Sequence, residues 1–290
     1  MQIGVVFPQT EIGANPAAVR DYVQAAEELG YGHTLVFDHV LGADAGRHAG
    51  WNGPYSHTDM FHEPFVLFGY LAGCTRRLEL VTGVIILGQR QTALVAKQAA
   101  EVDVLTRGRF RLGVGIGWNP VEYEALGVDF HTRATLYEEQ VEVMRRLWTE
   151  DVVTHNGPFL TIDRAGILPR PVQRPIPIWM GGGATRPVLE RIGRLADGWV
   201  CNTLPGHGLE EALVVIRDAA AAAGRDPDAI GLQGIVQPRP GEDPAVALPR
   251  QLERWAAVGA THVAVSGLNA GRSPDEHVSF IEEAAHTLLT

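Results

Sequence analysis

Short apolar runs alternate with longer segments along almost the entire chain. The apolar runs that we expect to be strands span 3–7, 33–37, 78–87, 110–115, 176–180, 198–201, 230–236 and 262–265. Each is followed, directly or after a loop, by a segment that we expect to be a helix. This alternation indicates a parallel sheet, and eight repeats within 290 residues favour a closed TIM (β/α)8 barrel over an open doubly wound sheet.

Two stretches interrupt the alternation. The first, 41–62, is polar, rich in Gly and His, and too long for a routine connection. The second, 151–175, contains four prolines and the sequence Thr154-His155-Asn156-Gly157, which predicts a β-hairpin within an irregular arm. Because no shift in composition marks a boundary, we expect residues 1–290 to form a single α/β barrel domain with loop insertions at 41–62 and 151–175.

The charge and hydropathy of the chain argue against several classes of partner. Its 34 acidic and 24 basic side chains give a formal net charge of −10, and the basic residues form no run. We therefore expect no nucleic-acid partner. No apolar run approaches the roughly 20 residues that cross a bilayer, and the N-terminus reads as a strand and not as a signal peptide. We expect a cytoplasmic protein with no membrane partner.

Three histidines in the first insertion, His48, His57 and His62, raise the alternative of a metal site. Barrel hydrolases that hold zinc usually carry an HxH pair at the end of the first strand, where this chain has Phe7-Pro8-Gln9. The three histidines also lack the i, i+4 spacing of a helical ligand pair. We expect no metal site, and a metal-dependent barrel hydrolase remains the more distant alternative.

Seven short motifs follow one another between His62 and Trp199. They are His62-Glu63-Pro64, Leu80-Val81-Thr82-Gly83-Val84, Ala96-Lys97-Gln98-Ala99-Ala100, the run from Gly108 to Trp118, Glu122-Tyr123-Glu124-Ala125-Leu126-Gly127, Pro177-Ile178-Trp179-Met180-Gly181-Gly182 and Ala196-Asp197-Gly198-Trp199. With these motifs in this order, the chain resembles the bacterial luciferase-like monooxygenase family, and in particular its branch that uses the deazaflavin coenzyme F420. The resemblance covers roughly residues 1–265.

The resemblance implies a tricyclic ring at the C-terminal ends of the barrel strands, which is also the general location of barrel active sites. It implies a cis peptide bond between Gly83 and Val84 that presses the backbone against the ring, so Thr82, Gly83 and Val84 are predicted to bind the cofactor. Glycine is unfavourable inside a strand because it has no side chain to pack. An ordinary β-bulge at this position is the alternative interpretation.

A second glycine-rich segment, Gly113-Val114-Gly115-Ile116-Gly117, ends the fourth expected strand. It does not follow the first strand and lacks the spacing of a dinucleotide-binding fingerprint. We interpret Gly115 and Gly117 as backbone room beside the ring, with Trp118 and Asn119 leaning over the pocket. The alternative is a tight turn that leads into a helix.

Gly181, Gly182 and Gly183 lie between an expected strand and an expected helix. Glycines there expose backbone N–H groups beside the positive end of a helix, which suits a phosphate group. We predict that they hold the phosphate of the cofactor tail, and a simple flexible turn is the alternative.

Asp38 and His39 follow the second expected strand, where they are predicted to reach the active-site mouth. A carboxylate and an imidazole there could orient a substrate or transfer a proton, because histidine titrates near neutral pH. The alternatives are that Asp38 caps a turn and that His39 is a packing residue.

The function that we predict is F420-dependent hydride transfer to or from a small organic substrate. The first alternative is an FMN-dependent, two-component monooxygenase that uses O2 and receives reduced FMN from a separate flavin reductase. A single lysine among the 24 basic residues is typical of a GC-rich genome, and with the resemblance it favours the deazaflavin. A flavin-binding protein without turnover is a further alternative.

The segment 64–74 is more apolar than one barrel face requires. With the expected helix at 92–105, it predicts a homodimer interface, as the resemblance also implies. The identity of the substrate cannot be read from the sequence.

Overall fold

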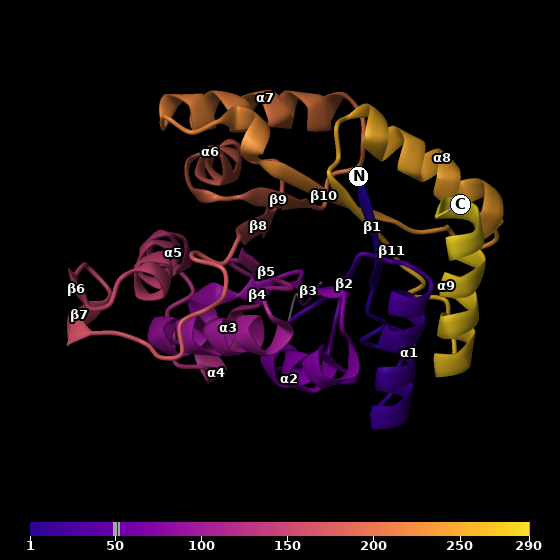
Figure 1. The fold of residues 1–290 in the computed structure, drawn as a ribbon, viewed down its shortest axis with the longest axis horizontal. Helices are drawn as coiled ribbons and strands as arrows, with labels where there is room; N and C mark the ends of the chain where they lie inside the picture. Colours follow the sequence, from indigo (N-terminus) through magenta and orange to yellow (C-terminus); the bar gives the residue numbers. More distant parts are fainter. Residues whose placement is uncertain (49–50, 52, 290) are drawn as a thin grey trace.

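Parallel strands close on themselves in the computed structural model, which describes all residues except 49, 50, 52 and 290. The hydrogen-bonded order is β3-β2-β1-β11-β10-β9-β8-β5-β4, and pairing of β3 with β5 closes the ring. β3 and β4 share one barrel position, so this order gives an eight-stranded barrel and confirms the predicted fold (Figure 1). The strands are β1 (Gln2–Val6), β2 (His33–Val36), β3 (Glu79–Thr82), β4 (Ile85–Ile86), β5 (Phe110–Gly115), β8 (Ile178–Gly182), β9 (Gly198–Cys201), β10 (Gly231–Val236) and β11 (His262–Val265).

Helices cover the outside of the barrel, and α1 and α9 lie side by side although they are far apart in sequence (Figure 1). The helices are α1 (Pro16–Glu28), α2 (Pro64–Cys74), α3 (Thr92–Thr106), α4 (Pro120–Ala125), α5 (Arg133–Thr149), α6 (Arg186–Leu195), α7 (His207–Ala222), α8 (Pro244–Ala257) and α9 (Pro274–Leu288). Several begin with a proline at the first turn behind a capping side chain, such as Asn15 before α1. Proline fits there because the first N–H groups of a helix have no partner within it.

The third barrel strand differs from the continuous strand expected at 78–87. It is divided into β3 and β4 at the Gly83–Val84 peptide bond, which is cis. A Cβ atom on Gly83 would lie 2.6 Å from the Leu35 side chain. Only glycine fits against Leu35 with this backbone.

The second insertion contains the predicted hairpin. β6 (Val153–Asn156) and β7 (Thr161–Ala165) pair antiparallel beside α5, away from the barrel strands (Figure 1). The carboxylate of Glu139 holds the hairpin, because it accepts hydrogen bonds from His155 and from the backbone N–H groups of Phe159 and Leu160. Within the described residues, no helix is both long and apolar enough to cross a membrane.

A polar cluster fills the barrel interior at the N-terminal ends of the strands. The Arg111 guanidinium lies 3.0 Å from the Glu79 carboxylate and stacks 4.3 Å from the Trp179 ring. The rings of His33 and His262 lie 5.8 Å apart beside it. Burial, and then the positive charge of Arg111, lower the pKa of His262 to about 3 and the pKa of His33 well below its ordinary value. Both histidines are therefore neutral in the folded protein at physiological pH.

We predict that the neutral His262 makes folding sensitive to mild acid. Its pKa is lower in the folded chain than in the unfolded chain, where it is about 6.5, so its contribution to stability is full above pH 6.5 and is lost as the pH falls towards 3. In urea unfolding between pH 7 and pH 5, His262→Asn should lose less stability than the wild type. The exposed His207 provides the control, since His207→Asn should keep the wild-type slope. Equal slopes for all three proteins would contradict the prediction.

Candidate active site

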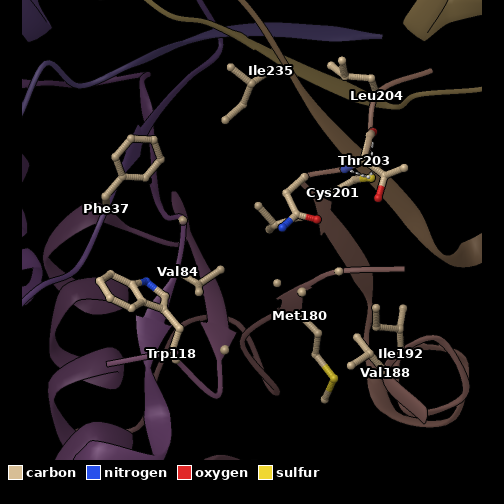
Figure 2. Close-up of a pocket in the computed structure, with 18 of the residues that line it drawn as sticks. Phe37, Val84, Trp118, Met180, Val188, Ile192, Cys201, Thr203, Leu204 and Ile235 are labelled. Atoms are coloured by element: carbon tan, nitrogen blue, oxygen red, sulfur yellow. Dashed lines mark hydrogen bonds between the residues drawn. The ribbon is translucent and has the colours of Figure 1, made fainter. Parts of the chain in front are cut away.

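A cavity of about 1050 Å³ opens at the C-terminal ends of the barrel strands. Its walls come from the ends of successive strands, including Phe37 after β2, Val84 before β4, Met180 on β8, Cys201 on β9 and Ile235 on β10. Figure 2 shows Val84 between Trp118 on one side and Met180 on the other. The volume lies at the upper end of the range for pockets that hold drug-sized ligands and cofactors, so it accommodates a tricyclic ring together with a small substrate.

The Val84 side chain packs against the backbone of two neighbouring strands. A Cβ atom on Gly115 or on Gly181 would lie 2.7 Å from a methyl group of Val84. A Cβ atom on Gly117 would lie 2.6 Å from Ile86. Val84 and Ile86 therefore occupy the space that a side chain at Gly115, Gly117 or Gly181 would need. The surface of this wall is formed more by these two aliphatic side chains than by the glycines.

Gly183 differs from these glycines. No atom lies within 4 Å of a Cβ atom built on it, and it precedes the N-terminus of α6. The capping residue of α6, Thr185, makes no hydrogen bond from its side chain to the first turn. In this turn Thr185 donates to the Gly183 carbonyl, Val188 donates to the Thr185 carbonyl, and Pro187 has no N–H. In the described residues, the N–H groups of Gly183, Ala184 and Arg186 have no backbone partner. Open space beside these three groups at the positive end of a helix is suited to a phosphate group.

Asp38 is buried at the base of the cavity and is held on both oxygens. Its Oδ1 accepts a hydrogen bond from Arg90 at 2.8 Å, and its Oδ2 accepts one from the Ile86 backbone N–H at 3.0 Å. Arg90 also lies 2.8 Å from Glu63 at the start of α2. Burial raises the pKa of Asp38 above its ordinary value, although Arg90 and the Ile86 N–H act in the opposite direction. Asp38 thus connects β2, β4 and, through Arg90, α2. Because both of its oxygens already accept hydrogen bonds, it is not available as a general base.

His39 pairs with Glu122 and not with Asp38. Its Nδ1 lies 3.3 Å from Glu122 Oε1, which also accepts hydrogen bonds from the backbone N–H groups of Val40 and Leu41. Gln89 donates to the other oxygen of Glu122. Burial disfavours the charged form of Glu122, but these hydrogen bonds outweigh it and lower the pKa of Glu122. An ionised Glu122 accepts a proton-bearing Nδ1, which leaves Nε2 of His39 available for a ligand.

Aromatic rings surround His39. The ring centroids of Tyr55, Phe61 and Trp118 lie 5.0, 4.8 and 5.6 Å from that of His39, each in an edge-on orientation. Tyr55 and Phe61 belong to the insertion at 41–62, so this loop encloses the imidazole on the solvent side. Enclosure in aromatic surroundings excludes water from a proton-transfer site.

The opposite wall comes from the strand ends after β9 and β10 and was not predicted from the sequence. Cys201 lies in it, with its sulfur 3.3 Å from the backbone N and O of Thr203. Burial raises the pKa of the Cys201 thiol to about 11, so the thiol is neutral and belongs to the apolar wall. Leu204, whose side chain is exposed, continues the same wall beyond Thr203 (Figure 2).

Ten of the twelve residues predicted from the sequence line the cavity. These are Asp38, His39, Gly83, Val84, Gly115, Gly117, Trp118, Gly181, Gly182 and Gly183. The other two have supporting contacts behind the wall: the Thr82 hydroxyl donates to the Gly113 carbonyl, and the Asn119 side chain caps α4 by accepting from the N–H groups of Val121 and Glu122.

The two most important partners that the sequence did not reveal are Arg90 and Glu122. Glu122 lies within one of the seven motifs, yet its pairing with His39 joins residues 83 positions apart. Arg90 follows a single turn of 3-10 helix at Leu87–Gln89, and nothing in its local sequence indicates the bridge to Asp38. In the described part of the chain, no group of three or more His, Cys, Asp or Glu side chains is arranged to hold a metal ion.

The chain is similar in sequence to known proteins over most of its length. The family model described as luciferase-like monooxygenase matches residues 1–287. An uncharacterised protein of Mycobacterium tuberculosis is 34% identical over 228 residues, which cover 78% of this chain and 76% of that protein. An F420-dependent glucose-6-phosphate dehydrogenase of Kineococcus radiotolerans is 30% identical over 254 residues, which cover 85% of this chain and 70% of that enzyme.

Solved structures with the same fold include both deazaflavin and flavin proteins. The F420-dependent tetrahydromethanopterin reductase of Methanopyrus kandleri gives a TM-score of 0.74 at 16% identity, over 99% of this chain and 98% of that one. A riboflavin lyase with modified FMN and riboflavin gives 0.78 at 16% identity, over 100% and 90%. A monooxygenase of Streptomyces bottropensis gives 0.77 at 21% identity, over 100% and 99%.

We predict that Arg90 is essential for the stability of this site. Arg90→Met leaves the buried Asp38 with one partner, and removing one side of a buried ion pair costs about 3 kcal/mol in the free energy of unfolding. Arg186→Met is the matched control, because it breaks an ion pair with the same 2.8 Å distance on the exposed face of α6 and should cost less than about 1 kcal/mol. Urea unfolding of both variants measures the difference, and equal losses would contradict the prediction.

Proposed function

Because this chain belongs to the luciferase-like monooxygenase family, we propose that it transfers a hydride between coenzyme F420 and a small organic substrate. The observation that supports this most directly is the cavity at the barrel mouth. It combines an aliphatic wall, an open glycine at a helix N-terminus and an enclosed imidazole. These features fit, respectively, a flat ring, the phosphate of its tail and the polar end of a substrate.

The residues present would hold such a cofactor in a defined way. Val84, Ile86 and Met180 offer apolar contacts for a ring. The backbone N–H groups of Gly183, Ala184 and Arg186, at the start of α6, are available to a phosphate. When bound, the deazaflavin supplies the hydride chemistry that no side chain can perform. The protein contributes position, exclusion of water and the proton that must accompany the hydride.

His39 is the group that we assign to proton transfer. Its Nδ1 faces Glu122, so Nε2 is free to donate a proton to a carbonyl oxygen, or to accept one from a hydroxyl in the reverse direction. The Glu122 carboxylate fixes the orientation of the ring by accepting a hydrogen bond from Nδ1. Tyr55, Phe61 and Trp118 keep water away from this pair.

The deazaflavin is favoured over FMN by the sequence relatives. The Kineococcus radiotolerans relative, at 30% identity, is an F420-dependent dehydrogenase. FMN-dependent oxygenation, with reduced FMN supplied by a separate flavin reductase, is the second candidate, because proteins of the same fold hold FMN.

The homodimer also belongs to this proposal. Val66 and Tyr70 on α2 and Leu94 on α3 are 74%, 41% and 51% exposed, which suits an apolar interface.

Direct binding measurements test the cofactor. Titration of the purified protein should give a dissociation constant for F420 at least tenfold below that for FMN, followed by the absorbance of each coenzyme. Reduced F420 should then be oxidised in the presence of a member of a panel of ketones and aldehydes. Tight binding of FMN alone, with O2 consumption when reduced FMN is supplied, would replace the proposal by the monooxygenase.

We predict that Gly183→Ala weakens cofactor binding without weakening the fold. The added methyl group meets no protein atom within 4 Å and therefore occupies the space assigned to the phosphate. The affinity for F420 should fall about tenfold, as for the loss of a charge-assisted hydrogen bond. The melting temperature should not fall.

Gly208→Ala on α7 is the matched control, because its methyl group also meets no atom and Gly208 lies outside the cavity. If both variants bind F420 with the wild-type affinity, the phosphate does not bind at Gly183.

We predict that His39→Ala lowers turnover far more than cofactor affinity. Loss of a general acid or base typically costs about 10²- to 10⁴-fold in kcat. The dissociation constant for F420 should change less than about threefold, because His39 faces Glu122 and the aromatic loop. Glu122→Gln should lower kcat less than His39→Ala and should shift the pH profile. A kcat unchanged in His39→Ala would exclude His39 from the mechanism.

A further inference from the structure

The cavity carries an excess of positive charge on the wall that lies across from Trp118. Arg239, Arg250 and Arg254 line it against one acid, Glu242, and a fourth lining arginine, Arg191, is already paired with Glu138 at 2.8 Å. This local balance is opposite to the net charge of −10 for the whole chain. A positive wall within a negative protein attracts and holds anions.

Two of these arginines are placed by α8. Arg250 and Arg254 are four residues apart, so they lie one turn apart on the same face of the helix. Gln251, between them, fastens α8 to the end of β10: its side chain accepts from the backbone N–H of Gln237 and donates to the Gln237 carbonyl. The backbone of both arginines is therefore fixed beside the cavity, and their side chains extend from it into solvent-accessible space.

The guanidinium groups are only partly satisfied by the protein. Arg254 donates from one nitrogen to the carbonyl of Pro205, beside Leu204, which Figure 2 shows on the side away from Trp118. Arg250 lies 3.1 Å from Glu242. In the described part of the chain, the Arg239 side chain has no ion pair. Since a guanidinium has five N–H donors, most of the donors at this wall face solvent or the cavity.

The other end of the cavity lacks such a feature. Its one carboxylate, Asp38, is neutralised by Arg90, and His39 is engaged by Glu122. A ligand that occupies the cavity therefore meets an imidazole and aromatic rings at one end and exposed guanidinium groups at the other.

We propose that Arg239, Arg250 and Arg254 form an anion subsite that binds a phosphate or carboxylate group of a cavity ligand. This inference rests on the proposed function only for the identity of the ligand. The anionic group can come from the glutamate carboxylates of the F420 tail or from an acidic group on the substrate. Arginine suits both groups, since its planar fork matches two oxygens of a phosphate or carboxylate. The subsite restricts the substrate to an anionic compound if the coenzyme tail does not occupy it.

Inorganic phosphate is the probe for this subsite. Isothermal titration of the full-length protein compares the wild type, Arg250→Gln/Arg254→Gln and the charge-matched Arg20→Gln/Arg217→Gln, whose arginines lie outside this cavity. We expect the first double variant to bind phosphate at least tenfold more weakly than the other two proteins. The same titration with Gly183→Ala separates this subsite from the phosphate site proposed at Gly183, because only phosphate bound at Gly183 should respond to that substitution.

Equal phosphate affinity in the three proteins, or no binding by the wild type, overturns the subsite. Circular dichroism and melting temperature verify that both double variants are folded. Repeating the titration on protein saturated with F420 identifies the source: loss of the Arg250- and Arg254-dependent binding assigns the subsite to the coenzyme tail, and its persistence assigns it to the substrate.

The deazaflavin core without phosphate and glutamates tests the proposed function separately. Both double variants should bind this core as the wild type does, within about twofold. If the wild type binds neither the core nor F420 while phosphate binding still depends on Arg250 and Arg254, the proposed function fails and the anion subsite stands.

Discussion

The contact between Val84 and the backbone of two neighbouring strands is the constraint on which the cavity depends. Gly115 and Gly181 each leave room for a methyl group of Val84, and a side chain at either position would overlap it. Val84 consequently forms a fixed ridge between β5 and β8, at the centre of the wall (Figure 2). Because packed interiors tolerate little change in volume, this ridge and the glycines beside it constrain one another.

Buried charges hold the elements around that ridge. Asp38 connects the end of β2 to the N–H of Ile86, two residues after Val84, and Arg90 extends the connection to Glu63 at the start of α2. A buried ion pair contributes little net stability compared with apolar packing, because both charges lose their hydration. The ion pair instead fixes geometry, because each buried charge is stable only when its partner is in contact with it. The Glu122 carboxylate fixes the geometry of His39 in a similar way, because it also accepts hydrogen bonds from two backbone N–H groups.

The barrel separates two polar regions of different character. At the N-terminal ends of the strands, Arg111 donates to Glu79 and Gln233 and stacks on Trp179. The two neutral histidines pair through Nδ1 with Gln2 and Thr261. At the C-terminal ends, guanidinium and imidazole groups face a cavity. Between them, Val6, Leu35, Val81, Ala264 and Leu268 form an apolar layer, against which Phe37 and Ile235 pack. This layer keeps the first region structural and leaves ligand chemistry to the second.

The sequence by itself determined the order of strands and helices, the closed barrel, the hairpin at 151–175 and ten of the residues that line the cavity. Periodicity and glycine position carry this information because they reflect local backbone requirements and the general rule that barrel sites lie after the strands. Only the tertiary structure decided the pairings: Asp38 with Arg90, His39 with Glu122, Val84 with Gly115 and Gly181, and the arginines of α8 with the cavity. These contacts join residues that are dozens of positions apart, so they depend on how the ring closes and on no local pattern in the chain.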